Sequence, residues 1–383
     1  MVTSLWVAGV LLLLLSAHPF ITYPLSLVLI RRFRRPEPLR LDTVPPPERF
    51  TVCVCAYNEE RVIEAKIENL LALKEREPGL EILVYVDAAT DRTAEILARY
   101  RDRIDVHVAT ERHGKTHGMN LLVAKASAPI VVFTDANVML APDALHHLRR
   151  YFTDPTVGCV CGNLTYTNPD ASVTAASGAR YWRLEQTIKQ LEQATGSVMG
   201  ADGSLFAIRR ALHHPPPDHI IDDMYVSFRI LCDGHRIVQA DDVCAYEESV
   251  SSGREEFRRK IRIACQAFNV HRLLWPRLRR LDGLTLYKYL SHKLIRWFSI
   301  YFLVLAGLAF QAALLLDRQG ALAVALAAGF ALAVTLGCLW PIKPFAQLAD
   351  ILSALLGTGL GVWRALRGER FQTWTPAASI RKS

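Results

Sequence analysis

Two long apolar stretches flank a region in which short apolar runs alternate with amphipathic ones. Residues 4–30 contain no Asp, Glu, Lys or Arg, and roughly 20 apolar residues in a helix span the hydrocarbon core of a bilayer. Residues 297–340 contain two further apolar runs separated by the polar linker 317–320. The pattern predicts an N-terminal transmembrane helix over 1–30 and a transmembrane helical hairpin over 297–340.

The charges that follow the first apolar run predict its orientation. The sequence RRFRR occupies residues 31–35, and basic residues favour the cytoplasmic side of a membrane span. A cleaved signal peptide would have basic residues ahead of a shorter apolar core, and residues 1–6 carry none. We therefore expect a retained anchor, a basic and Pro-rich linker over 31–49, and a cytoplasmic domain at the inner membrane of the cell.

The segment over residues 344–363 leaves two alternatives open. It contains Asp350, and the tail 364–383 that follows it is basic. If the segment crossed the membrane, this tail would lie outside, against the positive-inside tendency. An interfacial helix is favoured over a third membrane helix. Residues 276–296 are expected to be an amphipathic connector.

Between residues 50 and 275, strand-like runs alternate with amphipathic helical runs. This alternation predicts parallel βαβ units with right-handed crossovers, and thus the α/β fold class. Ligands of such sheets bind beyond the carboxyl ends of the strands. Three of the predicted strands end in polar groups, namely Asn58-Glu59, Asp87 to Asp91, and Asp135-Ala136-Asn137. The sequence therefore predicts a binding site where these ends meet.

Composition narrows the class of partner. The chain of 383 residues is 51% hydrophobic and has a formal net charge of +8, which suits contact with the lipids of an anionic inner membrane. No aromatic and basic platform is evident, so no nucleic-acid partner is expected. The cysteine pairs 53/55 and 159/161 lie within strand-like runs, without the C-x-x-C spacing or neighbouring histidines of a zinc site. Small buried residues in a reducing compartment are the favoured interpretation.

Some of the polar residues suggest chemistry directly. Asp87 and Asp91 suit hydrogen bonds from the base and ribose of a nucleotide, although Asp91 also suits capping of the helix that follows. Lys115 beside Gly114 suits a phosphate, but the spaced upstream glycine of a P-loop is absent. These signals are weak one by one.

Taken in chain order, six motifs resemble those of the family 2 glycosyltransferases. They are CAYNEERVI, VDAATDRTAEIL, HGKTHGMN, TDANVMLAPDAL, GADGSLFAIRR and IDDMYVSFRI. The resemblance covers roughly residues 50–275 and the flanking membrane segments, with an interfacial helix expected over 254–275. The resemblance is to bacterial membrane-bound enzymes such as the cellulose, chitin, hyaluronan and poly-N-acetylglucosamine synthases. It implies a GT-A fold, which is the Rossmann-like fold of nucleotide-diphospho-sugar transferases.

The resemblance also implies roles for individual residues. Asp223 would be the general base that accepts the proton of the acceptor hydroxyl, and the helix N-terminus there is expected to keep it ionised. Asp135 and Asn137 would bind Mg²⁺ or Mn²⁺, with Asn137 in place of the usual aspartate. The donor nucleotide would contact Tyr57, Glu59, Asp87, Asp91, Lys115, Asn120 and Asp135. Contacts to donor or acceptor would come from Gly203, Ser204, Asp222, Gln266, Arg259, Arg262, Trp374 and Arg381.

Three departures from the family pattern bear on function. Ala88 and Ala89 replace the usual Gly and Ser of the nucleotide-binding turn. Processive synthases carry Gln-x-x-Arg-Trp, and here Gln266 is followed by Asn269 and Val270. The C-terminal segment with Trp374 and Arg381 only loosely resembles a gating segment of such synthases.

Three functional hypotheses remain open from the sequence. The leading one is an inverting, metal-dependent transfer from a nucleotide sugar, expected to be a UDP-sugar, to a growing extracellular polysaccharide. The second is transfer of a single sugar to a lipid carrier or glycolipid, which the missing Arg-Trp favours. The third is an inactive nucleotide-binding membrane subunit. A homo-oligomer or an export partner is compatible with the small number of predicted spans.

Overall fold

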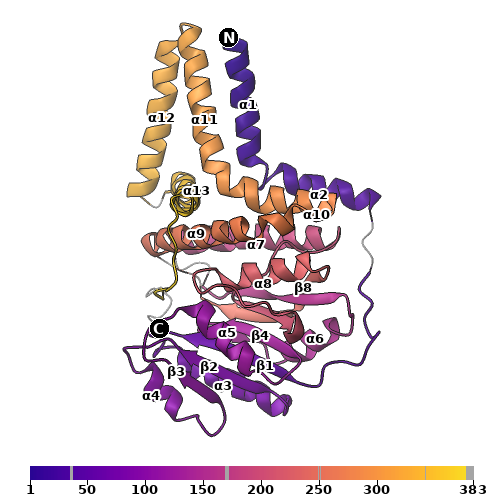
Figure 1. Cartoon of the computed structure of the whole chain (residues 1–383). Coiled ribbons are helices and arrows are strands. Elements are labelled where there is room, and N and C mark those ends of the chain that lie inside the picture. The colour runs from indigo at the N-terminus through magenta and orange to yellow at the C-terminus, as the bar shows by residue number, and fades with distance from the viewer. Residues whose placement is uncertain (35–37, 169–171, 249, 251, 341, 377–383) are drawn as a thin grey trace.

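An eight-stranded mixed sheet forms the centre of the polar domain (Figure 1). The computed structural model describes the chain apart from residues 35–37, 169–171, 249, 251, 341 and 377–383. The strands are arranged in the order β3-β2-β1-β4-β7-β6-β8-β5. Their bounds are β1 Phe50–Ala56, β2 Glu81–Val86, β3 Asp105–Val108, β4 Ile130–Asp135, β5 Met139–Leu140, β6 Val157–Tyr166, β7 Leu205–Arg209 and β8 Arg236–Glu247.

The first half of the sheet is parallel, as the sequence predicts. Strands β3, β2, β1 and β4 run in the same direction, and β7 then pairs antiparallel with both β4 and β6. Helices pack on both faces (Figure 1). These helices are α3 Ile63–Arg76, α4 Thr93–Ala98, α5 Lys115–Lys125, α6 Ala144–Tyr151, α7 Val173–Gln193 and α8 Asp222–Cys232. The predicted α/β class and the GT-A arrangement are confirmed.

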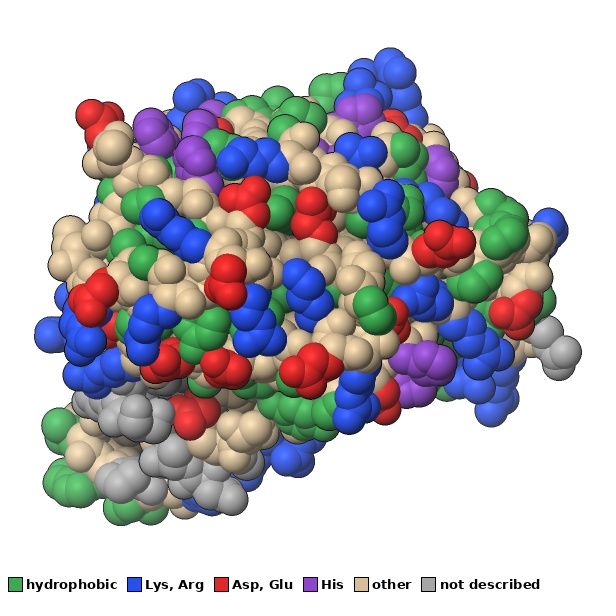
Figure 2. Space-filling view, turned by 90° about the horizontal axis from the view of Figure 1, so that it is seen from below, with side chains coloured by type: hydrophobic (Ala, Val, Ile, Leu, Met, Phe, Trp, Pro, Cys, Tyr) green, Lys and Arg blue, Asp and Glu red, His purple; other side chains and the backbone are tan. Residues whose placement is uncertain are grey.

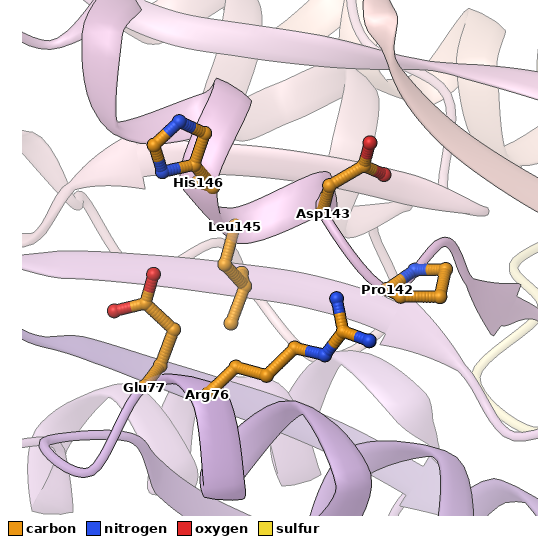
Figure 3. A pocket seen from close by; sticks show the side chains of 6 residues that line it. All are labelled: Arg76, Glu77, Pro142, Asp143, Leu145 and His146. Atoms are coloured by element: carbon orange, nitrogen blue, oxygen red, sulfur yellow. The ribbon is translucent and has the colours of Figure 1, made fainter.

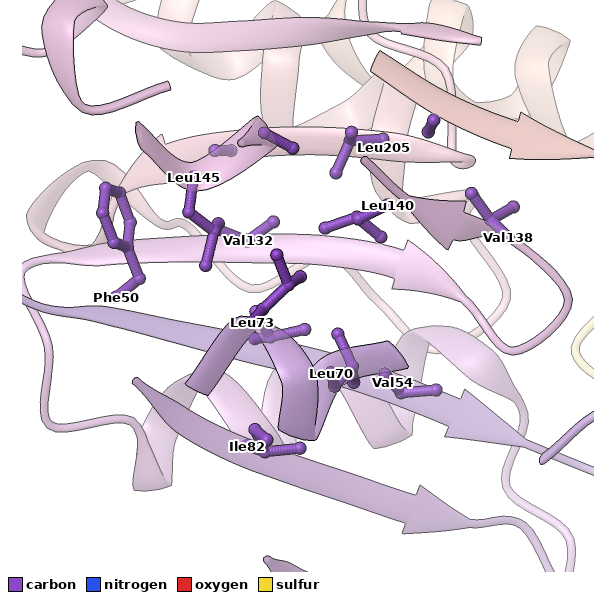
Figure 4. Close-up of a cluster of buried hydrophobic side chains, with 14 of the residues drawn as sticks. Phe50, Val54, Leu70, Leu73, Ile82, Val132, Val138, Leu140, Leu145 and Leu205 are labelled. Atoms are coloured by element: carbon purple, nitrogen blue, oxygen red, sulfur yellow. The ribbon is translucent and has the colours of Figure 1, made fainter. Parts of the chain in front are cut away.

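Two apolar cores lie on the two faces of the sheet. On one face, Val54, Ile82 and Val132 pack against Leu70 and Leu73 of α3 (Figure 4). The other core contains the buried Cys53, Cys55, Cys159 and Cys161 between the sheet and α5 and α8. Each large apolar side chain buried in this way stabilises the fold by roughly 1.5–3 kcal/mol.

The N-terminal apolar segment is two helices rather than the single helix predicted over residues 1–30. Helix α1 covers Val2–Ala17 and α2 covers Thr22–Phe33, and the pair is bent by 70°. The bend follows Pro19, which lacks the backbone N–H that a continuous helix needs. Helix α2 buries Tyr23 and Leu27 against the polar domain, and it already includes the start of the linker predicted over 31–49.

The predicted hairpin is present as α11 Ile295–Leu316 and α12 Gly320–Leu339. Helix α1 runs beside α11 (Figure 1), with the Trp6 and Phe310 ring centroids 5.5 Å apart. Large apolar side chains such as Val324 and Phe330 are exposed, which suits lipid contact. Among the described residues, three helices are long and apolar enough to cross a membrane, and a fourth span results if α1 and α2 count as one.

Residues 276–296 do not form the separate connector that the sequence suggested. The interfacial helix predicted over 254–275 is α9 Gly253–Leu278, which extends into this region. Helix α10 Gly283–Tyr289 and a π-helical turn at Leu290–Leu294 then run directly into α11. The region from Gly283 to Leu316 therefore acts as one helical unit of 34 residues.

Helix α13, Phe345–Leu366, lies across the base of the membrane helices. In Figure 1 it is seen nearly end-on, whereas α1, α11 and α12 are seen along their length. Small residues let it approach α9 closely, because a Cβ at Gly361 would lie 2.5 Å from the carbonyl oxygen of Ile261. This orientation favours the interfacial alternative that the sequence left open.

A buried polar cluster joins the membrane helices to the domain. His292 lies between two glutamates of α7, with Nδ1 2.6 Å from Glu192 and Nε2 2.9 Å from Glu185. The Tyr23 hydroxyl donates to Glu192 at 2.6 Å, and Arg296 pairs with Glu185 at 2.7 Å. Removing one member of such a cluster leaves an unpaired buried charge, which costs about 3–5 kcal/mol. The cluster therefore fixes α2 and α11 against the domain.

We expect Gly361→Leu to separate α9 from α13, because a side chain there meets the backbone of α9. Overpacking of this kind costs roughly 1–3 kcal/mol, so the detergent-solubilised variant should unfold at a lower temperature than the wild type. Gly329→Leu on α12 is the matched control, since nothing lies within 4 Å of a Cβ at that position. Equal unfolding temperatures for the two variants would contradict the close packing of α9 and α13.

Candidate active site

The polar strand ends predicted to converge lie at one edge of the sheet. In the parallel register, Cys55 of β1 is opposite Asp135 of β4, and Ala56 is opposite Val86 of β2. Tyr57 and Asp87 therefore follow their strands at the same level as Asp135. This edge is where the candidate active site is assembled.

Asp87 is fully buried and holds the loop that precedes α5. Its Oδ1 accepts from the backbone N–H groups of His113 at 2.7 Å and Gly114 at 3.1 Å, and Arg112 Nε donates to Oδ2 at 3.3 Å. The Arg112 guanidinium also lies over the Tyr57 ring, 3.4 Å from its centroid. The sequence did not point to Arg112, because this residue lies just outside the HGKTHGMN motif.

Asp91 stabilises the turn before α4, which is one of the two compatible roles that the sequence suggested for it. It accepts from the backbone N–H groups of Thr93 and Glu60, each at 3.0 Å. Glu59 is buried next to this turn, and its N–H donates to the Thr93 hydroxyl at 2.8 Å. Ala88 adopts φ 49°, a left-handed conformation that costs a residue with a Cβ about 1–2 kcal/mol. The glycine usual in the family would avoid that cost.

Lys115, the first residue of α5, lies at the centre of the site. Its Nζ is 2.6 Å from Asp135 Oδ1. Burial alone would lower the pKa of Lys115, but the carboxylates of Asp135, Asp222 and Asp223 outweigh it and raise the pKa. The ammonium is therefore charged. A phosphate at this position would compete with Asp135 for it.

Gly203 allows its loop to lie against the catalytic groups. A Cβ at this position would be 3.1 Å from Asp223 Oδ2 and 3.2 Å from Lys115 Nζ. The loop therefore brings Gly203 and the adjacent Ser204 to the same point as α5 and α8. The GADGSLFAIRR and IDDMYVSFRI motifs are therefore close to the HGKTHGMN motif in space.

Asp223 lies in the first turn of α8, and its Oδ1 accepts from the N–H of Met224 at 2.5 Å. Burial, and then the neighbouring charge of Asp222, raise the pKa of Asp223 to about 7 against the opposing charge of Lys115. Desolvation and the second carboxylate therefore oppose the effect of the helix N-terminus, which was expected to keep Asp223 ionised. Asp222 is buried, and its Oδ2 has no hydrogen-bond partner among the described residues.

The start of α8 is held by the first turns of α5. The Thr116 hydroxyl donates to the carbonyl of Ile220 at 2.6 Å, and His117 pairs with Asp218 at 3.1 Å. Asn120, predicted to contact the donor, donates from Nδ2 to the carbonyl of Pro216 at 2.8 Å, and its contact with the donor stays a prediction. Its role in the described structure is to position the segment that leads to Asp223.

The turn after β4 is held by two residues that the sequence analysis did not select. Lys66 of α3 is fully buried and donates to Thr134 Oγ1 at 3.1 Å and to the carbonyl of Val138. Glu247 accepts from Asn137 Nδ2 at 2.9 Å, and burial raises the pKa of Glu247 to about 7 against the charge of Arg259. The sequence contained one indication of Lys66, because it places a charged residue on the apolar face of a predicted helix.

The C-terminal tail crosses the site after leaving α13. Gln266 of α9 donates to the carbonyl of Phe371 at 2.8 Å, and Gln372 donates to the carbonyl of His113 at 3.0 Å. The Trp374 ring centroid is 6.0 Å from that of Tyr57. Trp374 thus lies beside the predicted donor pocket, while Arg381 falls outside the described residues.

The two basic residues of α9 that were predicted to contact donor or acceptor have protein partners. Arg262 donates to Gln266 Oε1 at 3.2 Å, and Arg259 pairs with Glu256 at 3.4 Å. Burial lowers the pKa of Arg262 to about 10. Both residues remain candidates for contact with the diphosphate, which is a prediction that the geometry leaves untested.

A surface pocket elsewhere on the domain contains none of the predicted site residues. It lies between the end of α3 and the start of α6 and is lined by Arg76, Glu77, Pro142, Asp143, Leu145 and His146 (Figure 3). The end of the molecule opposite the membrane helices carries intermixed acidic and basic side chains (Figure 2). Neither feature competes with the strand ends as the candidate active site.

The predicted cation ligands fit Mg²⁺ or Mn²⁺ in their chemistry. Asp135 and Asn137 are partly exposed and offer a carboxylate and an amide oxygen, and oxygen ligands are what these hard cations prefer. Within the described part of the chain, no group of three or more His, Cys, Asp or Glu side chains could hold a metal ion.

Comparison with known proteins identifies the class. The sequence profile described as glycosyltransferase like family 2 matches residues 46–266, which is more than half of the chain and includes all six motifs. The chain therefore belongs to glycosyltransferase family 2.

Particular relatives share the domain. Poly-beta-1,6-N-acetyl-D-glucosamine synthase of Staphylococcus aureus (strain COL) is 27% identical over 197 residues, which are 50% of this chain and 47% of the relative. The same enzyme of Staphylococcus epidermidis is 24% identical over 191 residues, 48% of this chain and 46% of the relative. The chain thus spans about half the length of the curated relatives it matches.

One solved structure resembles nearly the whole chain. Mannosyltransferase PcManGT from Pyrobaculum calidifontis, solved in complex with GDP-Man and Mn²⁺, is 23% identical with a TM-score of 0.73. The similarity covers 95% of this chain and 99% of that chain. At this identity the similarity shows that the two proteins share a fold.

We expect Gly203→Ala to slow turnover without destabilising the protein. The added Cβ would displace the ends of Asp223 and Lys115, and a misplacement of about 1 Å at a reacting group costs up to roughly 10²-fold in rate. Gly178→Ala in α7 is the control, because nothing lies within 4 Å of a Cβ there. Release of nucleotide diphosphate measures turnover, and thermal unfolding measures stability. Unchanged turnover in Gly203→Ala would place the reaction away from this loop.

Proposed function

We propose that this protein is an inverting, cation-dependent glycosyltransferase that adds a sugar from a nucleotide sugar to an acceptor at the membrane surface. The convergence of Asp223, Lys115 and Asp135 at the carboxyl ends of the parallel strands carries the proposal. These residues come from three separate elements, and the Gly203 loop closes over them. A carboxylate with a raised pKa beside a charged ammonium suits proton transfer next to a phosphate.

In the proposed reaction, Asp223 accepts the proton of an acceptor hydroxyl as that oxygen attacks the anomeric carbon of the donor sugar. The bond from this carbon to the diphosphate oxygen breaks, and the nucleoside diphosphate leaves with the electron pair. A single displacement inverts the anomeric configuration. Lys115 neutralises charge that develops on the leaving diphosphate, which stabilises the transition state.

Asp135 and Asn137 would hold Mg²⁺ or Mn²⁺ in the proposed site. When bound, the cation supplies positive charge that neutralises the diphosphate. Tyr57, beneath the Arg112 guanidinium and beside Trp374, would form the wall for the nucleotide base. Asp87 would support the nucleotide pocket by fixing the loop before α5, and Asp91 would support it by fixing the turn before α4.

For the acceptor, a growing extracellular polysaccharide is the first candidate. The staphylococcal relatives are named as synthases of a poly-N-acetylglucosamine, which supports a UDP-sugar donor and polymer synthesis. The apolar helices α11 and α12 support placement in the inner membrane of the cell with the catalytic domain in the cytoplasm. A homo-oligomer or an export partner would complete the path of a polymer.

A lipid-linked acceptor is the second candidate, and one observation favours it. Asn269 donates to the carbonyl of Glu369 at 3.1 Å, and Val270 is fully buried in the apolar core. These two positions, where processive synthases carry Arg and Trp, therefore face the tail and the interior. Neither side chain is available to line a channel for a polymer.

We expect Asp223→Asn to reduce sugar transfer by roughly 10²–10⁴-fold, the contribution typical of a general base, while nucleotide binding persists. The wild-type protein would be screened with UDP- and GDP-sugars plus Mn²⁺, and diphosphate release and product length would be measured. A long polymer supports the first acceptor, and a single addition to lipid supports the second. Nucleotide binding without turnover on any donor in the wild type would support an inactive subunit instead.

The pH dependence follows from the pKa of about 7 for Asp223. This carboxyl must be deprotonated to accept a proton, so kcat/KM should fall tenfold per pH unit below about pH 7 and level off above it. Glu247 has a similar pKa, so the profile should be repeated in Glu247→Gln at saturating Mn²⁺. Loss of the acidic limb in that variant would assign the limb to Glu247 and remove Asp223 as the titrating base.

A further inference from the structure

The pairing of two strands places Glu247 beside the turn that carries Asp135 and Asn137. Strand β5 runs antiparallel to β8, with Met139 opposite Tyr246 and Leu140 opposite Ala245. Continuing that register by one residue brings the segment before Met139 next to Glu247, the last residue of β8. The Glu247 carbonyl accepts from Thr167 N–H at 2.9 Å, so its backbone is fixed on the other side as well.

The contact between Glu247 and Asn137 sets the direction of the amide. Asn137 Nδ2 donates to Glu247 Oε1 at 2.9 Å. An ionised carboxylate only accepts hydrogen bonds, so the amide nitrogen must face Glu247 and the amide oxygen lies on the opposite branch. Asn137 is thereby held with its only metal-binding atom directed away from Glu247.

Charge gives a second, independent reason to assign Glu247 to this site. Asp135 and Asn137 together offer one negative charge, and one oxygen of Asp135 is already bonded to Lys115 at 2.6 Å. Arg259, the basic neighbour of Glu247, has its own carboxylate in Glu256 at 3.4 Å. A divalent cation bound at Asp135 and Asn137 would favour the ionised form of Glu247, whose carboxyl group already bonds Asn137.

We propose that Glu247 is a positioning residue of the cation site. It holds Asn137 so that the amide oxygen faces a divalent cation, and it supplies the negative charge that asparagine lacks. This inference rests on the proposed function, because it assumes that the nucleotide sugar is bound together with a cation. Hydrogen-bonded partners of metal ligands typically change metal affinity by 10–100-fold when they are removed.

The test measures Mn²⁺ binding rather than turnover. Free Mn²⁺ would be titrated by electron paramagnetic resonance against the full-length protein in detergent, with UDP and, separately, with GDP. Glu247→Gln keeps a hydrogen-bond acceptor but removes the charge, and we expect it to weaken Mn²⁺ binding about 10-fold or more. Glu248→Gln, the same change at the adjacent residue, should leave the affinity unchanged.

A double variant separates charge from misfolding. Asn137→Asp combined with Glu247→Gln moves the carboxylate from one side of the hydrogen bond to the other, and we expect it to restore the affinity to within about threefold of wild type. Wild-type affinity in Glu247→Gln, or no recovery in a folded double variant, would overturn the role of Glu247. Absence of Mn²⁺ binding in the wild type with either nucleotide would instead overturn the cation-dependent function.

Discussion

Charge balance around the Lys115 ammonium is the constraint on which the candidate active site depends. One ammonium acts on the carboxylates of Asp135, Asp222 and Asp223, which belong to β4 and α8. Without it, three carboxylates near one another in a partly buried site would repel and separate these elements. The balance is also incomplete, since negative charge remains in excess. That excess, together with burial, raises the pKa of Asp223 toward neutrality.

Helix α9 links this site to the membrane-facing helices. One side of α9 packs on α13 through Gly357 and Gly361, whose missing side chains let the two backbones approach. The same helix supplies Gln266, which binds the tail as it crosses the strand ends. The site is therefore supported by the layer that separates the domain from α11 and α12.

Local sequence patterns predicted the parts of this molecule that follow from periodicity and motif order. The alternation of runs predicted the parallel strands, and polar strand ends located Asp87 and Asp135. Glu247 could not be found in this way, because its place depends on β5, a strand of two residues whose partner lies more than a hundred positions away. The bend between α1 and α2 has a local signal, Pro19, but the run over residues 4–30 was treated as one apolar segment. What the sequence could not show is that the Tyr23 hydroxyl reaches Glu192, 169 positions away, and so holds α2 against the domain.

The contacts of α1 and α2 have a consequence for how the chain is made. Their partners lie late in the sequence: Trp6 packs on Phe310, and the Ser16 hydroxyl donates to the carbonyl of Ser299 at 2.9 Å. During synthesis these first helices lack their partners until the whole transferase domain has been translated. Only when His292 and α11 have been made can the buried cluster around His292 close. Docking of α1 and α2 against α11 and the domain is therefore among the last steps of folding.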